Sequence, residues 1–501
     1  MNKIISTLGI LCLSLTTAAY AAKKPNILVF LVDDMGLMDT SVPFLTNDKG
    51  EPKAYPLNKL YKTPNMEKLA SIGTRFETFY ANSVCSPTRI SIMTGQSSAR
   101  HHTTQWIRSE NNNRGPQGPP DWQWEGITKK HQTLPGLLKK DGYRTIYVGK
   151  AHFGPFKTYG ELPNNFGFDV NIGGCSYGQP GSYYGKDGFG WIKGNKRRAV
   201  PNLKKYHGKD IYLTGALTLE MSAAIKDAVD DDKPFFAYMA YYAVHAPFMP
   251  NTKYSPNYTD AEVSQKAQAY ATMIQSMDTS VGEIMKHLET LGVADNTLVL
   301  FLGDNGGDAP LGGVHTVASS APLRGKKGTH YEGGMRVPFI AAWAKADASN
   351  PAQKKLQIKA NAITTQMGTI HDIFPTLLET AGVGYQGKID GENLAPALSG
   401  GKFQGKRDFL MHFPHSHRSS YYTVYRTGDW KIIYHYTKPK EERYELFDLA
   451  TDPTEAKNLA QSNPEELKRM VKAMTAALED AGAQYPVDKK DPDTELKPIL
   501  P

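Results

Sequence analysis

The chain has 501 residues, of which 40% are apolar and 22% charged, so it can bury a large core and exceeds the usual size of one domain. The formal net charge of +8 is modest and no long block of Lys or Arg occurs, which argues against a nucleic-acid-binding protein. Only three cysteines occur, so the fold does not depend on a disulfide framework. A disulfide between Cys85 and Cys175, or a buried thiol, is the simplest structural alternative for Cys85.

The first expected element is an export signal at residues 1–21. It combines Lys3, an apolar run over 4–15 and the cleavage pattern Ala19-Tyr20-Ala21. The run is too short to span a bilayer, and no later stretch reaches about 18 uninterrupted apolar residues. We therefore expect a periplasmic or secreted protein with no stable membrane insertion, the alternative being an uncleaved anchor.

Apolar runs then alternate with helical patterns. The expected strands are Asn26–Val32, Thr145–Val148, Phe235–Tyr242, Thr297–Leu302 and Val337–Trp343. The expected helices are Met66–Ile72, Thr133–Lys140, Ser264–Leu291 and His371–Ala381. Near-continuous apolar strands separated by helices are typical of parallel sheets covered on both faces. The pattern predicts an α/β/α sandwich with a large, mostly parallel central sheet over residues 22–401.

The rest of the chain departs from this alternation. Residues 154–198 are rich in Gly, Tyr, Phe and Lys, which predicts a long ordered loop over a site. Residues 390–401 have the composition of a linker. The elements expected after it are strands at Tyr421–Tyr425, Trp430–Tyr436 and Tyr444–Leu449 and a helix at Pro464–Ala481. They predict a smaller C-terminal α+β domain with an antiparallel sheet at residues 402–501.

Reactive residue types follow several of the expected strands directly. They are Asp33, Asp34, Lys150, His152, His245, Asp304 and Asn305. Ligands in open α/β sheets bind beyond the carboxyl ends of the strands, so these side chains are expected at one edge. Asp33, Asp34, Asp304 and Asn305 offer only oxygen ligands, which favours Ca²⁺ or Mg²⁺ over zinc. Without a cation, the carboxylates would repel and raise one another's pKa.

Cys85 begins an expected helix that carries Arg89 one turn further on. A helix N-terminus with an arginine in its first turns favours anions. Lys150 and Lys327 add positive charge. The sequence thus predicts a pocket for a small tetrahedral oxyanion beside a metal ion.

Together these motifs resemble the type I sulfatase family of the alkaline-phosphatase-like superfamily. The matching segments are Cys85-Ser86-Pro87-Thr88-Arg89, Asp33-Asp34, Gly149-Lys150-Ala151-His152, His245-Ala246-Pro247, Gly303-Asp304-Asn305-Gly306 and Leu323-Arg324-Gly325-Lys326-Lys327-Gly328. The resemblance extends from residue 25 to about residue 460. Thr88 stands where serine is commoner, and Gly303 where serine often precedes the Asp-Asn pair.

The resemblance implies that Cys85 is oxidised to formylglycine (3-oxoalanine) by a formylglycine-generating or anaerobic sulfatase-maturating enzyme. The modified residue at position 85 would join Asp33, Asp34, Asp304 and Asn305 as a ligand of Ca²⁺. Its hydrate, a gem-diol ionised by the cation, would attack sulfur, and its second hydroxyl would later allow sulfate to be expelled.

The resemblance also implies roles for the remaining residues. Arg89 and Lys150 would hold the hydrated aldehyde, and His152 would act as the base that assists sulfate release. His245 and Lys327 would contact the bridging oxygen of the ester. We favour His245 as the general acid because the reference pKa of histidine lies near neutrality.

The expected substrate is a sulfated glycan, with galactose-type units as the favoured sugar. Candidate substrate-binding residues are His101, His102, Trp106, Arg108, Tyr177, His412, His415 and His417, and surface histidines are the alternative. A phosphodiesterase or phosphonate hydrolase of the same superfamily is the rival enzyme. A non-catalytic glycan-binding protein is disfavoured, because His245 and Lys327 are both present.

Overall fold

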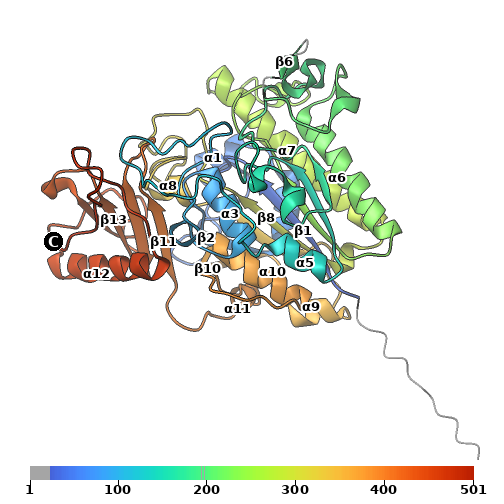
Figure 1. The fold of residues 1–501 in the computed structure, drawn as a ribbon. Coiled ribbons are helices and arrows are strands. Elements are labelled where there is room, and N and C mark those ends of the chain that lie inside the picture. The colour runs from blue at the N-terminus through green and yellow to red at the C-terminus, as the bar shows by residue number, and fades with distance from the viewer. Residues whose placement is uncertain (1–22, 193–194, 197) are drawn as a thin grey trace, which may run out of the picture.

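The computed structural model describes residues 23–501 except 193–194 and 197, so the expected export signal at 1–21 lies outside the described residues. Two sheets organise the protein, one of eight strands and one of four. Figure 1 shows the smaller sheet and its helix at one side of the larger body. Within the described ranges, no helix is long and apolar enough to cross a membrane.

The eight-stranded sheet forms the centre of the larger body. Its order is β10 (Ala362–Thr369), β2 (Thr74–Tyr80), β9 (Phe339–Trp343), β8 (Thr297–Gly303), β1 (Asn26–Val32), β7 (Phe235–Ala240), β3 (Arg144–Gly149) and β4 (Val170–Ile172). Strand β9 pairs antiparallel with β8 and β2, whereas the other neighbours pair in parallel. The predicted mostly parallel central sheet is confirmed.

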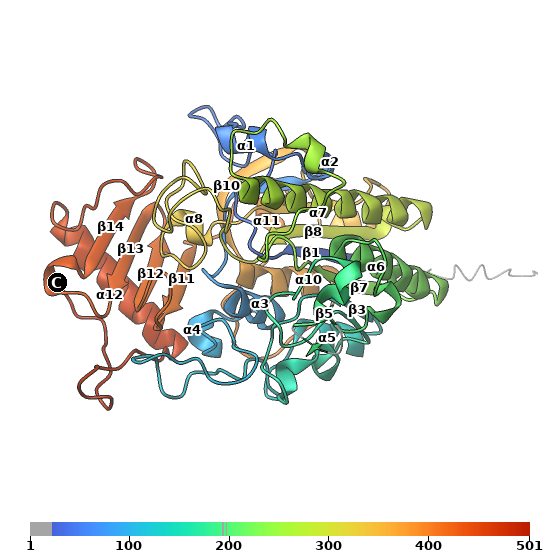
Figure 2. The same cartoon turned by 90° about the horizontal axis from the view of Figure 1, so that it is seen from above.

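Helices cover both faces of this sheet. One face carries α2 (Pro64–Ile72), α6 (Leu213–Asp230) and α7 (Gln265–Thr290), and the other carries α3 (Cys85–Thr94), α5 (Leu134–Lys140) and α10 (Ile373–Ala381). Figure 2 shows α7 and α3 on opposite sides of β1 and β8. Shorter helices are α1 (Pro56–Leu60), α4 (Ser98–His101), α8 (Glu332–Met335), α9 (Pro351–Lys355) and α11 (Ala395–Leu398).

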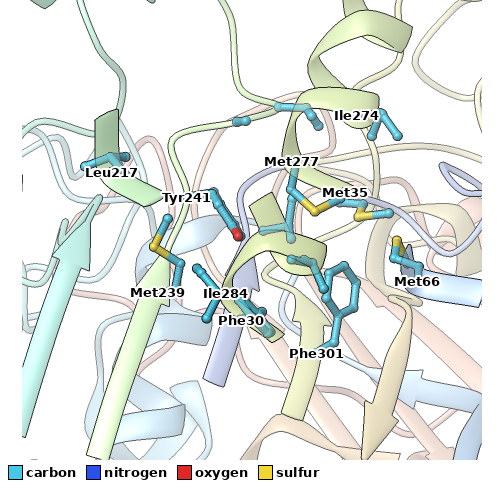
Figure 3. Close-up of a cluster of buried hydrophobic side chains, with 14 of the residues drawn as sticks. Phe30, Met35, Met66, Leu217, Met239, Tyr241, Ile274, Met277, Ile284 and Phe301 are labelled. Carbon is cyan, nitrogen blue, oxygen red and sulfur yellow. The ribbon is translucent and has the colours of Figure 1, made fainter. Parts of the chain in front are cut away.

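Strand β1 shows why the sandwich forms. All seven of its residues are buried, and alternate side chains enter different cores, Leu28 and Phe30 on one face and Ile27 and Val29 on the other. On the first face, the ring of Phe30 stacks on Tyr241 with centroids 6.3 Å apart. Figure 3 shows Met239 and Met277 in the same cluster of buried side chains. A strand buried on both faces therefore needs the continuous apolar run that the sequence provides.

The four-stranded sheet is antiparallel and consists of β11 (Asp408–Phe413), β12 (Tyr422–Thr427), β13 (Trp430–His435) and β14 (Tyr444–Asp448). Helix α12 (Pro464–Ala481) packs on one face. The other face meets Tyr80, Val84 and Met335 of the larger body. The predicted C-terminal antiparallel sheet with one helix is confirmed.

Several elements were not predicted. Strands β2 and β10 carry too many polar residues to read as buried strands, and β11 and helix α6 were also missed. The expected linker at 390–401 contains α11 and buries Leu394 and Leu398 in the core. The expected loop at 154–198 includes β4 and two short antiparallel strands, β5 (Trp191–Ile192) and β6 (Asn195–Lys196).

Candidate active site

Three parallel strands of the large sheet, with β7 between β1 and β3, deliver carboxylates and a lysine to one edge. Asp33 and Asp34 follow β1, Asp304 follows β8, and Lys150 follows β3 after Gly149. Gly149 has φ +111°, and a Cβ there would lie 1.8 Å from the carbonyl oxygen of Ala240, so the turn requires glycine. Oxygen atoms of the three aspartates lie within 4.8 Å of one another, and all three side chains are buried.

These oxygens fit a hard cation. Asn305 donates from Nδ2 to Oδ1 of Asp34 at 3.0 Å, while its own buried Oδ1 has no hydrogen-bond partner in the described part of the chain. An unmet amide oxygen beside three carboxylates is the donor set that Ca²⁺ and Mg²⁺ prefer. Burial raises the pKa of Asp33 to about 6, and burial and the nearby Asp33 raise the pKa of Asp304 to about 6, although Lys150 and Arg89 lower both values.

Three basic side chains contact the same carboxylates. Lys150 Nζ lies 2.7 Å from Asp33, Lys327 Nζ lies 2.7 Å from Asp34, and Arg89 donates to Asp304 at 2.8 and 3.0 Å. Three negative and three positive charges therefore balance before any ion is bound. A divalent cation would leave the centre at +2, which favours an anionic ligand.

Cys85 is the first residue of α3 and a free thiol. Its Sγ lies 3.3 Å from Nδ1 of His152, and Nε2 of His152 donates to the carbonyl oxygen of Ile107 at 2.6 Å. Because that donation places the proton on Nε2, the lone pair of Nδ1 faces position 85. Burial, and then the neighbouring Lys150, lower the pKa of His152 well below its usual value, so the ring is neutral.

His245 lies close to Asp34. Its Nδ1 donates to the carbonyl oxygen of Ala246 at 2.8 Å, and its Nε2 lies 3.6 Å from Asp34 Oδ2. Burial and the charge of Lys327 lower the pKa of His245 to about 3. The pKa of His245 therefore lies well below the near-neutral value that favoured it as the general acid.

A pocket of about 600 Å³ opens above these groups. Its lining includes Cys85, Trp106, Arg108, Ser109, Glu110, His152, Tyr177, Gln179, Arg198, His245, Asp308, Lys327, His417 and Arg418. The basic residues Arg108, Arg198, Lys327 and Arg418 outnumber the acidic ones. The pocket is thus polar, positively charged and directly connected to Cys85.

Of the candidate substrate-binding residues, four line the pocket and four do not. Trp106, Arg108, Tyr177 and His417 line the pocket. Four other histidines lie outside its lining and bond within the protein: His101 to Ser91, His102 to the carbonyl of Gly482, His412 to Thr423 and the carbonyl of Gln484, and His415 to Thr104 and the carbonyl of Arg114. Each of these four has a structural partner that explains its presence.

Arg198, Asp308 and Arg418 also line the pocket and were not predicted from the sequence. Arg418 forms a two-pronged ion pair with Asp308, with distances of 2.6 and 2.9 Å, and both line the pocket. Asp308 lies four residues beyond Asp304, so its proximity to the strand end was the available signal. For Arg418, the only signal in the sequence was its position next to His417, which is weaker evidence.

Comparison with known proteins places this geometry in a family. The sulfatase family model matches residues 25–383, and the model of the N-sulphoglucosamine sulphohydrolase C-terminal region matches residues 326–484. An N-acetylgalactosamine-6-sulfatase from Canis lupus familiaris is 31% identical over 412 residues, covering 78% of this chain and 69% of the relative. A sulfatase from Formosa agariphila is 28% identical over 516 residues, covering 89% and 86%.

Solved structures agree with the sequence comparisons. The crystal structure of Ps i-CgsB superimposes with a TM-score of 0.71 at 25% identity, covering 91% of this chain and 93% of that one. The same protein in complex with k-i-k-neocarrahexaose gives a TM-score of 0.70. With the family model matching most of the chain and the motif residues meeting around one pocket, the protein belongs to the sulfatase family and is a sulfuric ester hydrolase.

Proposed function

We propose that this protein is an exported carbohydrate sulfatase that hydrolyses sulfate esters on sulfated glycans containing galactose-type units. The observation that carries the proposal is the position of Cys85, which lies in a positively charged pocket beside His152 and above the carboxylate cluster. The relative named as an N-acetylgalactosamine-6-sulfatase and the neighbour with a bound neocarrahexaose support a sugar substrate. A phosphodiesterase or phosphonate hydrolase activity is not favoured by these relatives.

Cys85 is the proposed site of oxidation to formylglycine by a formylglycine-generating or anaerobic sulfatase-maturating enzyme. When formed, the hydrated aldehyde would supply an oxygen nucleophile and a route for sulfate to leave without water attacking sulfur. The chain contributes the position: the first turn of α3 holds residue 85 at the pocket, 3.3 Å from His152.

Asp33, Asp34, Asp304 and Asn305, together with the modified residue 85, would hold Ca²⁺, with Mg²⁺ as the chemically similar alternative. Bound there, the cation would polarise oxygens at position 85 and neutralise the substrate sulfate. Arg89 and Lys150 hold Asp304 and Asp33 in place through the contacts described above, and their charges face the same small volume.

His152 is the proposed proton acceptor at position 85. Its Nε2–H is fixed on the carbonyl of Ile107, so Nδ1 is available as a base at the distance of a hydrogen bond. A ring that stays neutral is suited to this role, and burial keeps it neutral.

His245 is the proposed general acid for the leaving sugar oxygen, with Lys327 as the alternative. Both side chains line the pocket next to Asp34. An arriving sulfate monoester adds negative charge beside His245, which opposes the effect of Lys327 and favours the protonated ring.

The chain is proposed to consist of an export signal and two structural units, with four residues that contact the sugar. Residues 1–21 would be removed on export to the periplasm or outside the cell, residues 22–401 would form the catalytic domain, and residues 402–501 a C-terminal subdomain. Trp106, Arg108, Tyr177 and His417 would contact the sugar, because they line the pocket.

The testing experiment uses protein made in a host that contains a maturating enzyme. Mass spectrometry of the peptide containing Cys85 measures conversion, and ion chromatography measures sulfate released from defined mono- and oligosaccharides. The panel should include N-acetylgalactosamine and galactose sulfated at position 6, the matching glucose-type isomers, and a phosphodiester and a phosphonate ester as controls. Sulfate release from the galactose-type sugars is expected. A retained thiol with turnover of the phosphorus esters would overturn the proposal.

A further inference from the structure

A second cluster of potential metal ligands lies away from the pocket, between the large body and the C-terminal sheet. It comprises His330, His435 and Glu445, whose nitrogen and carboxylate atoms lie within 4.8 Å of one another. His435 Nε2 is 2.6 Å from Glu445 Oε1, and His330 Nε2 is 3.6 Å from the same oxygen. The three groups therefore converge on one small volume.

The fold brings these residues together from two parts of the chain. His435 ends β13 and Glu445 lies in β14, where Ile433 is paired with Glu445. His435 is therefore the diagonal neighbour of Glu445 on the same face of the sheet. His330 comes from the larger body, three residues after Lys327, and its ring centroid lies 4.9 Å from that of His435.

His330 has an unusual environment for a histidine with a purely structural role. It is 5% exposed, and within the described ranges neither ring nitrogen has a hydrogen-bond partner. A neutral imidazole always carries one N–H donor and one acceptor nitrogen, so both are unmet here. Ring contacts with Tyr331 and Tyr422 account for the packing of its carbons but leave the nitrogens unexplained.

We propose that His330, His435 and Glu445 form a binding site for one Zn²⁺ ion, independent of the calcium site. Two imidazoles and one carboxylate are a ligand set that zinc prefers, with a fourth position for water. Tetrahedral zinc with bonds of about 2.0–2.1 Å places its ligands roughly 3.3 Å apart, and the distances of 2.6 and 3.6 Å bracket that value.

The surroundings support a bound cation. Tyr331 donates its hydroxyl to Oε2 of Glu445 at 3.0 Å, which orients the carboxylate and leaves Oε1 toward the histidines. The nearby charge of Lys431 is neutralised by ion pairs with Glu332 and Glu455 at 2.9 and 2.6 Å. His315 lies beside the cluster, with its ring centroid 6.1 Å from that of His330.

The chemistry separates the two metal sites. The cluster beside Cys85 offers only oxygen atoms, which favours Ca²⁺ or Mg²⁺. The second cluster offers two nitrogens and one oxygen, which favours Zn²⁺. A zinc ion here would join the segment carrying Lys327 to strands β13 and β14. Since zinc would bind the folded chain and not an unfolded one in this arrangement, it should raise the melting temperature.

The test uses tag-free full-length protein with Cys85→Ser, so that neither an affinity tag nor the active-site thiol binds zinc. After chelation and return of calcium, zinc binding is measured by competition with a chromophoric chelator, and bound metal by mass spectrometry. One zinc per chain is expected, with a higher melting temperature. Adding His435→Gln should weaken zinc binding by at least about 100-fold. That loss exceeds the one usual for residues that only hydrogen-bond to a metal ligand.

Two matched variants control for indirect effects. His412→Gln changes another buried histidine of the same sheet, whose nitrogens are both bonded, and should leave zinc affinity unchanged. Asp34→Asn should weaken calcium binding and leave zinc binding intact. Equal zinc affinity with and without His435→Gln would overturn the proposal, as would absence of zinc binding by the parent protein.

A spectroscopic measurement keeps the test independent of how well the variants fold. X-ray absorption at the zinc edge of the parent protein should show nitrogen and oxygen ligands at about 2.0–2.1 Å with the scattering pattern of two imidazoles. A shell of oxygen ligands without imidazole scattering would place the ion elsewhere and refute the assignment.

Discussion

Two buried charge clusters in this protein resemble each other in composition and differ in what they leave unpaired. The active-centre cluster consists of Asp33, Asp34, Asp304, Arg89, Lys150 and Lys327. The interface cluster, between the large body and the C-terminal sheet, consists of Glu332, Arg336, Lys431 and Glu455. Lys431 and Glu332 are fully buried, as are Arg89 and Asp304.

The interface cluster is closed by its own contacts. Tyr80 donates to Glu332 at 2.7 Å, Lys431 bridges Glu332 and Glu455, and the backbone N–H of Glu332 donates to Glu455 at 2.7 Å. Burial alone would raise the pKa of Glu332, but Lys431 and Arg336 lower it to about 2. These contacts join the C-terminal sheet to the larger body, and none of the four side chains has an unmet polar atom in the described residues.

The active-centre cluster differs because two neighbouring residues are available to a ligand. The buried Oδ1 of Asn305 has no hydrogen-bond partner in the described part of the chain, and Cys85 lines a pocket. Burial and shifted pKa values occur in both clusters, so neither property marks a functional site by itself. What distinguishes a candidate binding site is a buried polar atom that lacks a hydrogen-bond partner and lies beside other potential metal ligands. The same criterion selects His330.

The sharpest separation of the two clusters comes from Cys85→Ser. Turnover should fall below detection in a host that modifies only cysteine, because the nucleophile is lost, while the protein stays folded and calcium stays bound through Asp33, Asp34, Asp304 and Asn305. Sulfate release and calorimetry measure the two properties. Cys175→Ser is the matched control and should retain activity, since Cys175 is a buried thiol outside the pocket lining. Full activity of Cys85→Ser would refute the formylglycine assignment.

Cation removal tests the active-centre cluster in a second way. Dialysis against a calcium chelator should stop turnover, because Asp33, Asp34 and Asp304 would hold no ion to polarise the nucleophile. Sulfate-release assays should show recovery with Ca²⁺ or Mg²⁺ and none with Zn²⁺ alone. Recovery with zinc alone would contradict an oxygen-only calcium site.

His245→Ala separates leaving-group protonation from the rest of the reaction. A sugar alkoxide needs a proton to leave and a nitrophenolate hardly does, so glycan desulfation should slow by about 10²–10⁴-fold and an accepted aryl sulfate much less. His152→Ala is the matched variant and should slow both esters alike, because its role follows loss of the alcohol. Steady-state rates on both esters decide; equal losses with His245→Ala would leave Lys327 as the acid.

Lys431→Met addresses the interface cluster. It leaves Glu332 and Glu455 buried without their shared cation, which is expected to lower the free energy of unfolding by about 3–5 kcal/mol. Denaturant titration measures the loss, and calcium affinity of the folded fraction should not change. Lys23→Met removes an ion pair at the exposed surface and should alter neither property. A stable Lys431→Met protein would show that the cluster does not hold the two sheets together.

The sequence alone determined the large parallel sheet, the C-terminal antiparallel sheet and the residues now found around Cys85. It could do so because a strand buried on both faces needs a continuous apolar run, as in β1, and because parallel strands end at one edge, where Asp33 and Asp304 follow directly. Strands with mixed composition, such as β2 and β10, carry no comparable signal.

Only the tertiary structure decided which histidines face the pocket and which pack elsewhere. His417 lines the pocket, while His412, in β11, and His415, beyond its end, bond to protein groups. The meeting of His330 with His435 and Glu445 likewise depends on how one sheet docks on the other body. Contacts between segments about 100 residues apart follow from packing, which no local pattern records.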